Sequence, residues 1–86
     1  MPEIEIYTTP LCPFCSRAKR LLDKKNATYT EIDLWKERAR RPEMVERANG
    51  RTSVPQIFID GKGIGGSDEL AGLDQAGELD TLLAAG

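Results

Sequence analysis

The sequence predicts an α/β fold in which helices flank a mixed four-stranded sheet, with the elements in the order β-α-β-α-β-β-α. Two strand-like segments, residues 4–8 and 29–34, are separated by an amphipathic helix, so these two strands should be parallel. Asp60-Gly61 joins two further short strands, residues 56–59 and 62–64, as an antiparallel hairpin. Covering both faces of one sheet with the helices is the economical way to bury these elements.

The first strand and the first helix are indicated by a change in the spacing of the apolar residues, from every second residue to every third or fourth. Ile4 and Ile6 alternate with glutamates, which is the pattern of a strand with one buried face. The helix should begin at Pro13, whose missing N–H is no loss in a first turn, and Asn26 is a candidate end. Its small and apolar positions fall at helical spacing: Cys15, Ala18, Leu21 and Leu22.

Two further helices are expected. Residues 36–49 form a highly charged one, with Pro42 in its first turn or at a kink and Asn49-Gly50 at its end. Residues 65–69 resemble a helix entry with acids in the first turn. The last helix should then run to the end of the chain, with Gly77 as the site of a bend. The leucines that indicate it are Leu70, Leu73, Leu79, Leu82 and Leu83.

Length and composition predict a single globular domain over residues 1–86. With 12 basic and 14 acidic residues the net charge is −2, which argues against a chain dedicated to binding nucleic acid. No apolar run approaches the roughly 20 residues of a membrane span, and the acidic N-terminus is unlike a signal peptide. We therefore expect a cytoplasmic monomer that binds neither nucleic acid nor membrane.

The chain contains two cysteines, Cys12 and Cys15, and no histidine. In a reducing cytosol, a lone Cys-x-x-Cys is more often catalytic or metal-binding than structural. A tetrahedral zinc site needs four ligands, so we expect no metal within one chain. A metal or cluster shared between two chains stays open.

Cys12 is the candidate nucleophile because it lies at a strand-to-helix junction, directly before Pro13. The unpaired N–H groups and the positive end of the helix dipole favour an anion there, and Arg17 and Lys19 follow one to two turns later. These conditions favour the reactive thiolate. Cys15, one turn inside the helix, should stay a thiol until it attacks a mixed disulfide on Cys12.

Separated motifs in the right order resemble the glutaredoxin family, and most of all its small bacterial dithiol members. The motifs are Glu5-Ile6-Tyr7-Thr8, Cys12-Pro13-Phe14-Cys15, Arg17-Ala18-Lys19, Ser53-Val54-Pro55-Gln56-Ile57-Phe58-Ile59-Asp60-Gly61 and Ile64-Gly65-Gly66-Ser67-Asp68-Glu69-Leu70. The resemblance implies the thioredoxin fold and thiol–disulfide exchange with glutathione as cosubstrate. The partners it implies are disulfide-containing or glutathionylated proteins. Cys12 matches the family's nucleophile and Cys15 its resolving cysteine.

The resemblance also implies a set of contacts with glutathione. The matching positions are Phe14, Arg47, Ser53, Val54, Pro55, Gly66, Ser67 and Asp68. The backbone of Val54, before a proline that is cis in the family, would pair with the glutathione peptide. The N–H groups at Ser67 and Asp68 would receive the γ-glutamyl carboxylate, and the Asp68 carboxylate would face its ammonium group.

The chain departs from the family pattern at two positions. Phe14 replaces the usual tyrosine, which removes a hydroxyl, and Thr9 replaces a common lysine, which removes a cation near the thiolate. Arg47 matches a position that binds the glycine carboxylate of glutathione, and Arg51 is a weaker candidate for that role. Trp35 is expected to be packing or surface cover without a function.

Two alternatives stay open. One is a related redoxin that a thioredoxin reductase reduces in place of glutathione, against which Val54, Ser67 and Asp68 argue. The other is a dimer that holds an iron–sulfur cluster on two Cys12 thiolates and two glutathiones. Pro13 argues against the cluster, because family members with proline at this position are generally poor at holding one.

Overall fold

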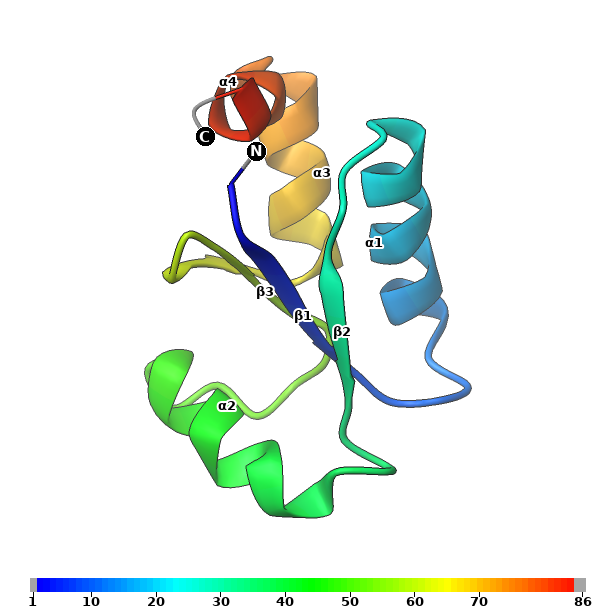
Figure 1. Cartoon of the computed structure of the whole chain (residues 1–86), viewed down its shortest axis with the longest axis vertical. Helices are drawn as coiled ribbons and strands as arrows, with labels where there is room; N and C mark the ends of the chain where they lie inside the picture. Colours follow the sequence, from blue (N-terminus) through cyan, green and yellow to red (C-terminus); the bar gives the residue numbers. More distant parts are fainter. Residues whose placement is uncertain (1, 85–86) are drawn as a thin grey trace.

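The computed structural model describes residues 2–84 and contains one four-stranded sheet with the strand order β2-β1-β3-β4 (Figure 1). The elements are β1 (Ile4–Thr8), α1 (Pro13–Lys24), β2 (Thr30–Asp33), the 3-10 turn η1 (Arg38–Arg40), α2 (Arg41–Arg47), β3 (Gln56–Ile59), β4 (Lys62–Gly65), α3 (Ser67–Gln75) and α4 (Glu78–Ala84). β1 and β2 are parallel, and β3 and β4 form an antiparallel hairpin. The predicted fold class is confirmed.

The strand register brings three loops to one edge of the sheet. Thr8 at the end of β1 is paired with Asp33 at the end of parallel β2. β3 runs antiparallel to β1, so that its first residue, Gln56, is paired with Tyr7. The loops that follow β1 and β2 and the loop that precedes β3 therefore leave the same edge, which carries Cys12 (Figure 1).

Alternation along the strands creates two cores, one on each face of the sheet. α1, α3 and α4 cover one face and α2 covers the other (Figure 1). The first core contains Ile4, Ile6, Ala18, Leu22, Ala27, Ile57, Ile59, Leu70 and Leu79. The second contains Tyr7, Ile32, Leu34, Met44, Ala48 and Phe58. α1 therefore packs its apolar side against the sheet. Its first turn lies at the edge of the sheet that carries Cys12.

The turns follow the residues that favour a left-handed backbone. Asn26 ends α1 with φ 57°, and Asp60 and Gly61 connect β3 to β4 with φ of 50° and 79°. Two positive φ values in succession are the requirement of the tight hairpin turn that Asp-Gly predicts.

Two predicted helices differ from the structure in extent. α2 begins only at Arg41, with Pro42 in its first turn, because proline lacks an N–H and its ring clashes with the preceding turn. The residues before it form the 3-10 turn. The last helix is divided in two rather than bent, because Gly77 adopts φ 76° between α3 and α4. Among residues 2–84, no helix is long and apolar enough to cross a membrane.

We expect Leu22→Ala to lower the free energy of unfolding by about 2–5 kcal/mol, because Leu22 is fully buried between α1 and the sheet. Urea denaturation followed by circular dichroism measures the change. Leu11→Ala is the matched control: Leu11 is fully exposed, so its loss should change stability by no more than about 0.5 kcal/mol. Equal effects of the two substitutions would contradict the packing described here.

Candidate active site around Cys12

Cys12 is the N-cap residue of α1. Its backbone is extended, with φ −110° and ψ 104°, and its Sγ accepts a hydrogen bond from the Cys15 N–H at 3.2 Å. The first N–H groups of a helix have no partner within the helix, so they offer hydrogen bonds and partial positive charge to an anion. The Cys12 sulfur occupies the place that an aspartate or serine oxygen takes in an ordinary helix cap. The start of α1 therefore directs a hydrogen-bond donor and partial positive charge at the Cys12 sulfur.

Cys15 is in a contrasting environment one turn later. Its side chain is buried, with 1 % of its surface exposed. Burial, together with the hydrogen bond to Cys12, raises the pKa of the Cys15 thiol above its ordinary value of 9.0. Both cysteines are free. The pair therefore combines a partly exposed cysteine with a buried one whose thiol is harder to ionise.

The loop before β3 lies against the Cys12 sulfur. The Val54–Pro55 peptide bond is cis, as the family resemblance implies. The Val54 carbonyl oxygen lies 4.0 Å from Cys12 Sγ. The side-chain amide of buried Gln56 donates to the Ser53 carbonyl oxygen at 3.0 Å and to its hydroxyl at 3.3 Å, which fixes the loop from below.

The start of α3 forms the other side of the site. Gly65 and Gly66, directly before α3, allow it to lie close to the Val54–Pro55 loop. Gly65 adopts φ 111°, and a Cβ there would lie 2.7 Å from a carboxylate oxygen of Glu69. A Cβ on Gly66 would lie 3.3 Å from the Pro55 carbonyl oxygen, tighter than ordinary van der Waals contact. Glycine is thus required for the first turn of α3 to lie against the Val54–Pro55 loop.

A cleft of about 200 Å³ lies between these elements. Its lining residues are Phe14, Arg51, Ser53, Val54, Pro55, Gly66, Ser67, Asp68 and Glu69. The structure therefore brings together every position predicted from the resemblance except Arg47. Phe14 forms one wall with its exposed ring. Arg51 and Glu69 are additional members, joined by an ion pair of 3.4 Å.

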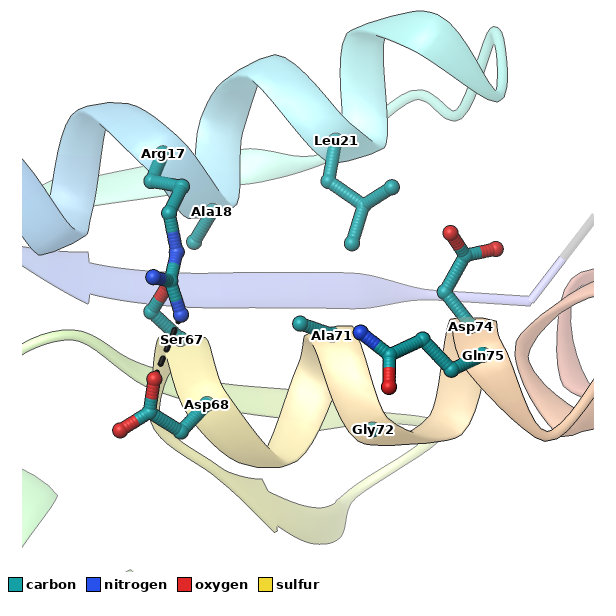
Figure 2. A pocket seen from close by; sticks show the side chains of 9 residues that line it. All are labelled: Arg17, Ala18, Leu21, Ser67, Asp68, Ala71, Gly72, Asp74 and Gln75. Atoms are coloured by element: carbon teal, nitrogen blue, oxygen red, sulfur yellow. Dashed lines mark hydrogen bonds and ion pairs between the residues drawn. The ribbon is translucent and has the colours of Figure 1, made fainter.

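The Arg17 guanidinium is hydrogen-bonded to the side chains of Ser67 and Asp68 at the start of α3. Its Nε donates to the Ser67 hydroxyl at 2.8 Å, and a terminal nitrogen donates to Asp68 at 2.5 Å (Figure 2). The guanidinium carbon lies 5.8 Å from the centre of the Phe14 ring. Because the Asp68 side chain is 81 % exposed, its second oxygen remains accessible to a ligand cation. A larger groove of about 570 Å³ continues from here between α1 and α3 (Figure 2).

Arg47 lies outside this cleft and makes structural contacts. Its guanidinium donates to Glu5 and to the Tyr7 hydroxyl, both at 2.8 Å, and lies 4.1 Å from the centre of the Phe58 ring. The Tyr7 hydroxyl in turn donates to Glu43. These bonds tie α2 to the underside of the sheet. Arg51, the weaker candidate by sequence, is the arginine that lines the cleft.

Sequence reasoning missed the part played by Glu69. Its carboxylate accepts the Gly66 N–H at 2.5 Å, and this hydrogen bond is the main cause of its lowered pKa. A glutamate three residues after the N-cap residue of a helix often accepts the N-cap N–H. The sequence Gly66-Ser67-Asp68-Glu69 contains that signal, with Gly66 as the N-cap. Glu69 thereby holds Arg51 at the rim of the cleft.

Comparisons with known proteins agree with this geometry. The family model described as Glutaredoxin matches residues 4–64. The chain is 51 % identical over 83 residues to Glutaredoxin 3 of Escherichia coli K12, covering 96 % of this chain and 99 % of that protein. It is 46 % identical over 85 residues to a glutaredoxin of Pseudomonas aeruginosa, covering 99 % and 100 % of the two chains.

Solved structures show the same fold. A glutaredoxin from Brucella melitensis superposes with a TM-score of 0.82 at 48 % identity, covering 96 % of this chain and 89 % of that one. A buckwheat glutaredoxin, solved as a complex with glutathione, superposes with a TM-score of 0.88 at 31 % identity. That match covers 96 % of this chain and 77 % of the buckwheat chain.

We expect iodoacetamide at neutral pH to modify Cys12 and to spare Cys15 in the folded protein. Cys12 is partly exposed and its sulfur accepts the Cys15 N–H, whereas burial shields Cys15 and raises its pKa. Mass spectrometry of the intact protein and of its peptides measures the site and the rate. Cys12→Ser is the control and should show almost no rapid labelling. An adduct on Cys15 at a comparable rate would contradict the assignment.

Proposed function

We propose, from the premise that this chain belongs to the glutaredoxin family and is a thiol–disulfide oxidoreductase, that glutathione is its reductant and that Cys12 is its nucleophile. The substrates proposed are protein disulfides and mixed disulfides between proteins and glutathione. The observation that carries the proposal is one cleft, beside the Cys12 sulfur, that contains Val54, Ser67 and Asp68. The buckwheat relative, whose structure contains glutathione, supports it.

The cleft suits the two ends of glutathione. The Val54 backbone, beside the Cys12 sulfur, would pair with an extended peptide in the manner of an added strand. The N–H groups at the start of α3 offer hydrogen bonds to the γ-glutamyl carboxylate, and Asp68 offers a carboxylate to its ammonium group. Arg51 supplies a cation at the rim for the glycine carboxylate. A tripeptide bound in this way would present its thiol to Cys12.

With a protein disulfide, the Cys12 thiolate attacks one substrate sulfur. A bond forms between that sulfur and Cys12, the substrate disulfide breaks, and its other sulfur leaves as a thiolate that takes up a proton. Cys15 then loses its proton and attacks the Cys12 sulfur, which releases the second substrate thiol. The protein has lost two electrons and the substrate has gained two. Two glutathione molecules restore the dithiol and become glutathione disulfide.

With a glutathionylated protein, one cysteine suffices. Cys12 attacks the glutathione sulfur, the protein thiol leaves, and Cys12 itself becomes glutathionylated. The thiolate of a second glutathione then attacks the glutathione sulfur held on Cys12. That attack releases glutathione disulfide and returns the Cys12 thiolate. Cys15 takes no part in this route.

The two routes predict different results for the two cysteines. Cys12→Ser should abolish both activities, whereas Cys15→Ser should keep removal of glutathione and lose most reduction of protein disulfides. NADPH consumption with glutathione and glutathione reductase measures both, with a mixed disulfide of glutathione and a small thiol as one substrate and a disulfide-bonded protein as the other. Turnover that survives in Cys12→Ser would refute the assigned nucleophile.

Arg51 and Arg47 should separate in the same assay. We expect Arg51→Met to raise the KM for glutathione about three- to tenfold without changing stability, because Arg51 lines the cleft and is half exposed. Arg47→Met should leave this KM nearly unchanged and lower the free energy of unfolding by about 1–3 kcal/mol, because it breaks the bonds to Glu5 and Tyr7. A raised KM for glutathione in Arg47→Met, with an unchanged KM in Arg51→Met, would show instead that Arg47 binds the carboxylate.

A further inference from the structure

The exposed large hydrophobic side chains of residues 2–84 gather at the edge of the sheet that carries Cys12. They are Leu11, Phe14 and Trp35. Phe14 belongs to the cleft described above, whereas Leu11 and Trp35 contribute to no described pocket. Leu11 is fully exposed and has φ 58°, a conformation that is uncommon for a bulky residue. Trp35 is 62 % exposed.

Leu11 and Trp35 lie on the loops that follow two paired strand ends. Leu11 lies three residues beyond the end of β1, and Trp35 lies two residues beyond the end of β2. The two strand ends are joined by the paired Thr8 and Asp33 and by the bond from the Leu34 N–H to the Thr8 carbonyl oxygen, 2.9 Å. The loops that follow β1 and β2 leave the sheet at this same edge (Figure 1).

The turn at Trp35 is ordered. The Asp33 carboxylate accepts the Trp35 N–H at 2.8 Å, and its carbonyl oxygen accepts the N–H groups of Lys36 at 3.1 Å and Glu37 at 2.9 Å. The Arg38 guanidinium lies 4.7 Å from the centre of the Trp35 ring. The indole is therefore held on the surface by its own turn and by a cation, although it is not packed into a core.

Positive charge surrounds Trp35. Residues 35–41 contain four basic side chains and one acid. Arg40 is neutralised by Glu37 and Glu43, whereas no carboxylate of residues 2–84 pairs with Lys36, Arg38 or Arg41. Residues 67–80 contain five acids and no basic residue, but four of these acids pair with basic side chains of other segments: Asp68, Glu69, Asp74 and Asp80. The unpaired basic groups around Trp35 therefore stand out although the net charge is −2.

Arg41 connects this basic segment with the active site. Its guanidinium donates to the Thr52 carbonyl oxygen at 3.1 Å, directly before the Ser53–Pro55 loop that lines the cleft. This bond brings one basic side chain of the segment next to the loop that lines the cleft beside Cys12.

We propose that Leu11, Trp35, Lys36, Arg38 and Arg41 form a docking surface for acidic protein segments that flank a substrate disulfide. The inference rests on the proposed function, because it supplies the protein-substrate specificity of the same reaction. Exposed apolar side chains within a polar rim are typical of protein-binding surfaces, and tryptophan and arginine are the residues that most often dominate them. Unpaired basic groups around the apolar pair select acidic partners and speed their encounter.

The chain contains a single tryptophan, so its fluorescence reports on this surface directly. The first measurement titrates the protein with two peptides in which Ser-x-x-Ser replaces a Cys-x-x-Cys, one flanked by glutamates and one by lysines. These probes bind without exchanging disulfides. We expect the acidic peptide to change the Trp35 emission and to bind about tenfold more tightly than the basic one, with the difference disappearing as salt is added.

The charge-reversed variant Lys36→Glu/Arg38→Glu should lose this preference. The matched control is Arg20→Glu/Lys24→Glu, which makes the same charge change on exposed positions of α1, away from the Cys12 edge. With the disulfide-bonded forms of the peptides, the docking variant should raise the KM for the acidic peptide about tenfold, and the control should leave it unchanged.

Turnover of the small glutathione mixed disulfide, measured on the same preparations, keeps the two proposals distinguishable. Absence of that turnover in the wild-type protein would contradict the proposed function, whether or not either peptide binds. Normal turnover with equal affinity for both peptides, with no binding of either, or with equal effects of the two double variants would overturn the docking surface. Tighter binding of a short single-stranded DNA than of the acidic peptide would also overturn it.

Discussion

The chemistry of this protein depends on one hydrogen bond, from the Cys15 N–H to the Cys12 sulfur at the start of α1. It places the proposed nucleophile where a helix can stabilise a negative charge, and it requires the helix to begin within one residue of the first cysteine. Pro13 suits that start because its fixed φ and missing N–H match a first helical position. The same turn buries Cys15, so a single local geometry caps the helix with one sulfur and shields the other from solvent.

The sheet determines what surrounds this sulfur. Parallel pairing of β1 with β2 and antiparallel pairing with β3 bring two strand ends and one strand beginning to the same edge. The loop after β1 supplies Cys12, and the loop before β3 supplies the Val54 carbonyl oxygen. Neither loop could be placed by its own sequence, since both positions are set by long-range pairing. The Gly65-Gly66 step then lets α3 complete the cleft without a side chain in the way.

Local patterns predicted the order and type of the elements, because each strand and turn has a short-range cause. The Asp60-Gly61 turn and the Asn26 helix end needed only a residue that tolerates positive φ. Helix extent was less predictable, because Pro42 and Gly77 interrupt otherwise helical patterns and the pattern alone does not distinguish a bend from a break. In the site, Arg47 has the sequence position of a carboxylate-binding residue, but its guanidinium binds Glu5 and Tyr7 instead. These two partners lie on β1, so only the folded structure shows that they engage Arg47.

The same long-range pairing changes the electrostatic explanation of the site. The sequence places Arg17 and Lys19 on the helix that follows Cys12, which predicts that both cations support its thiolate. In the structure Arg17 is bound to Asp68, and Lys19 is bound to Glu31 at 3.0 Å. Each cation is offset by a carboxylate from a distant segment, so the start of α1 is left as the principal stabiliser of the anion. That arrangement keeps the rim of the cleft polar and its charges paired, while the Cys12 sulfur is contacted by a helix N–H rather than by a side-chain cation.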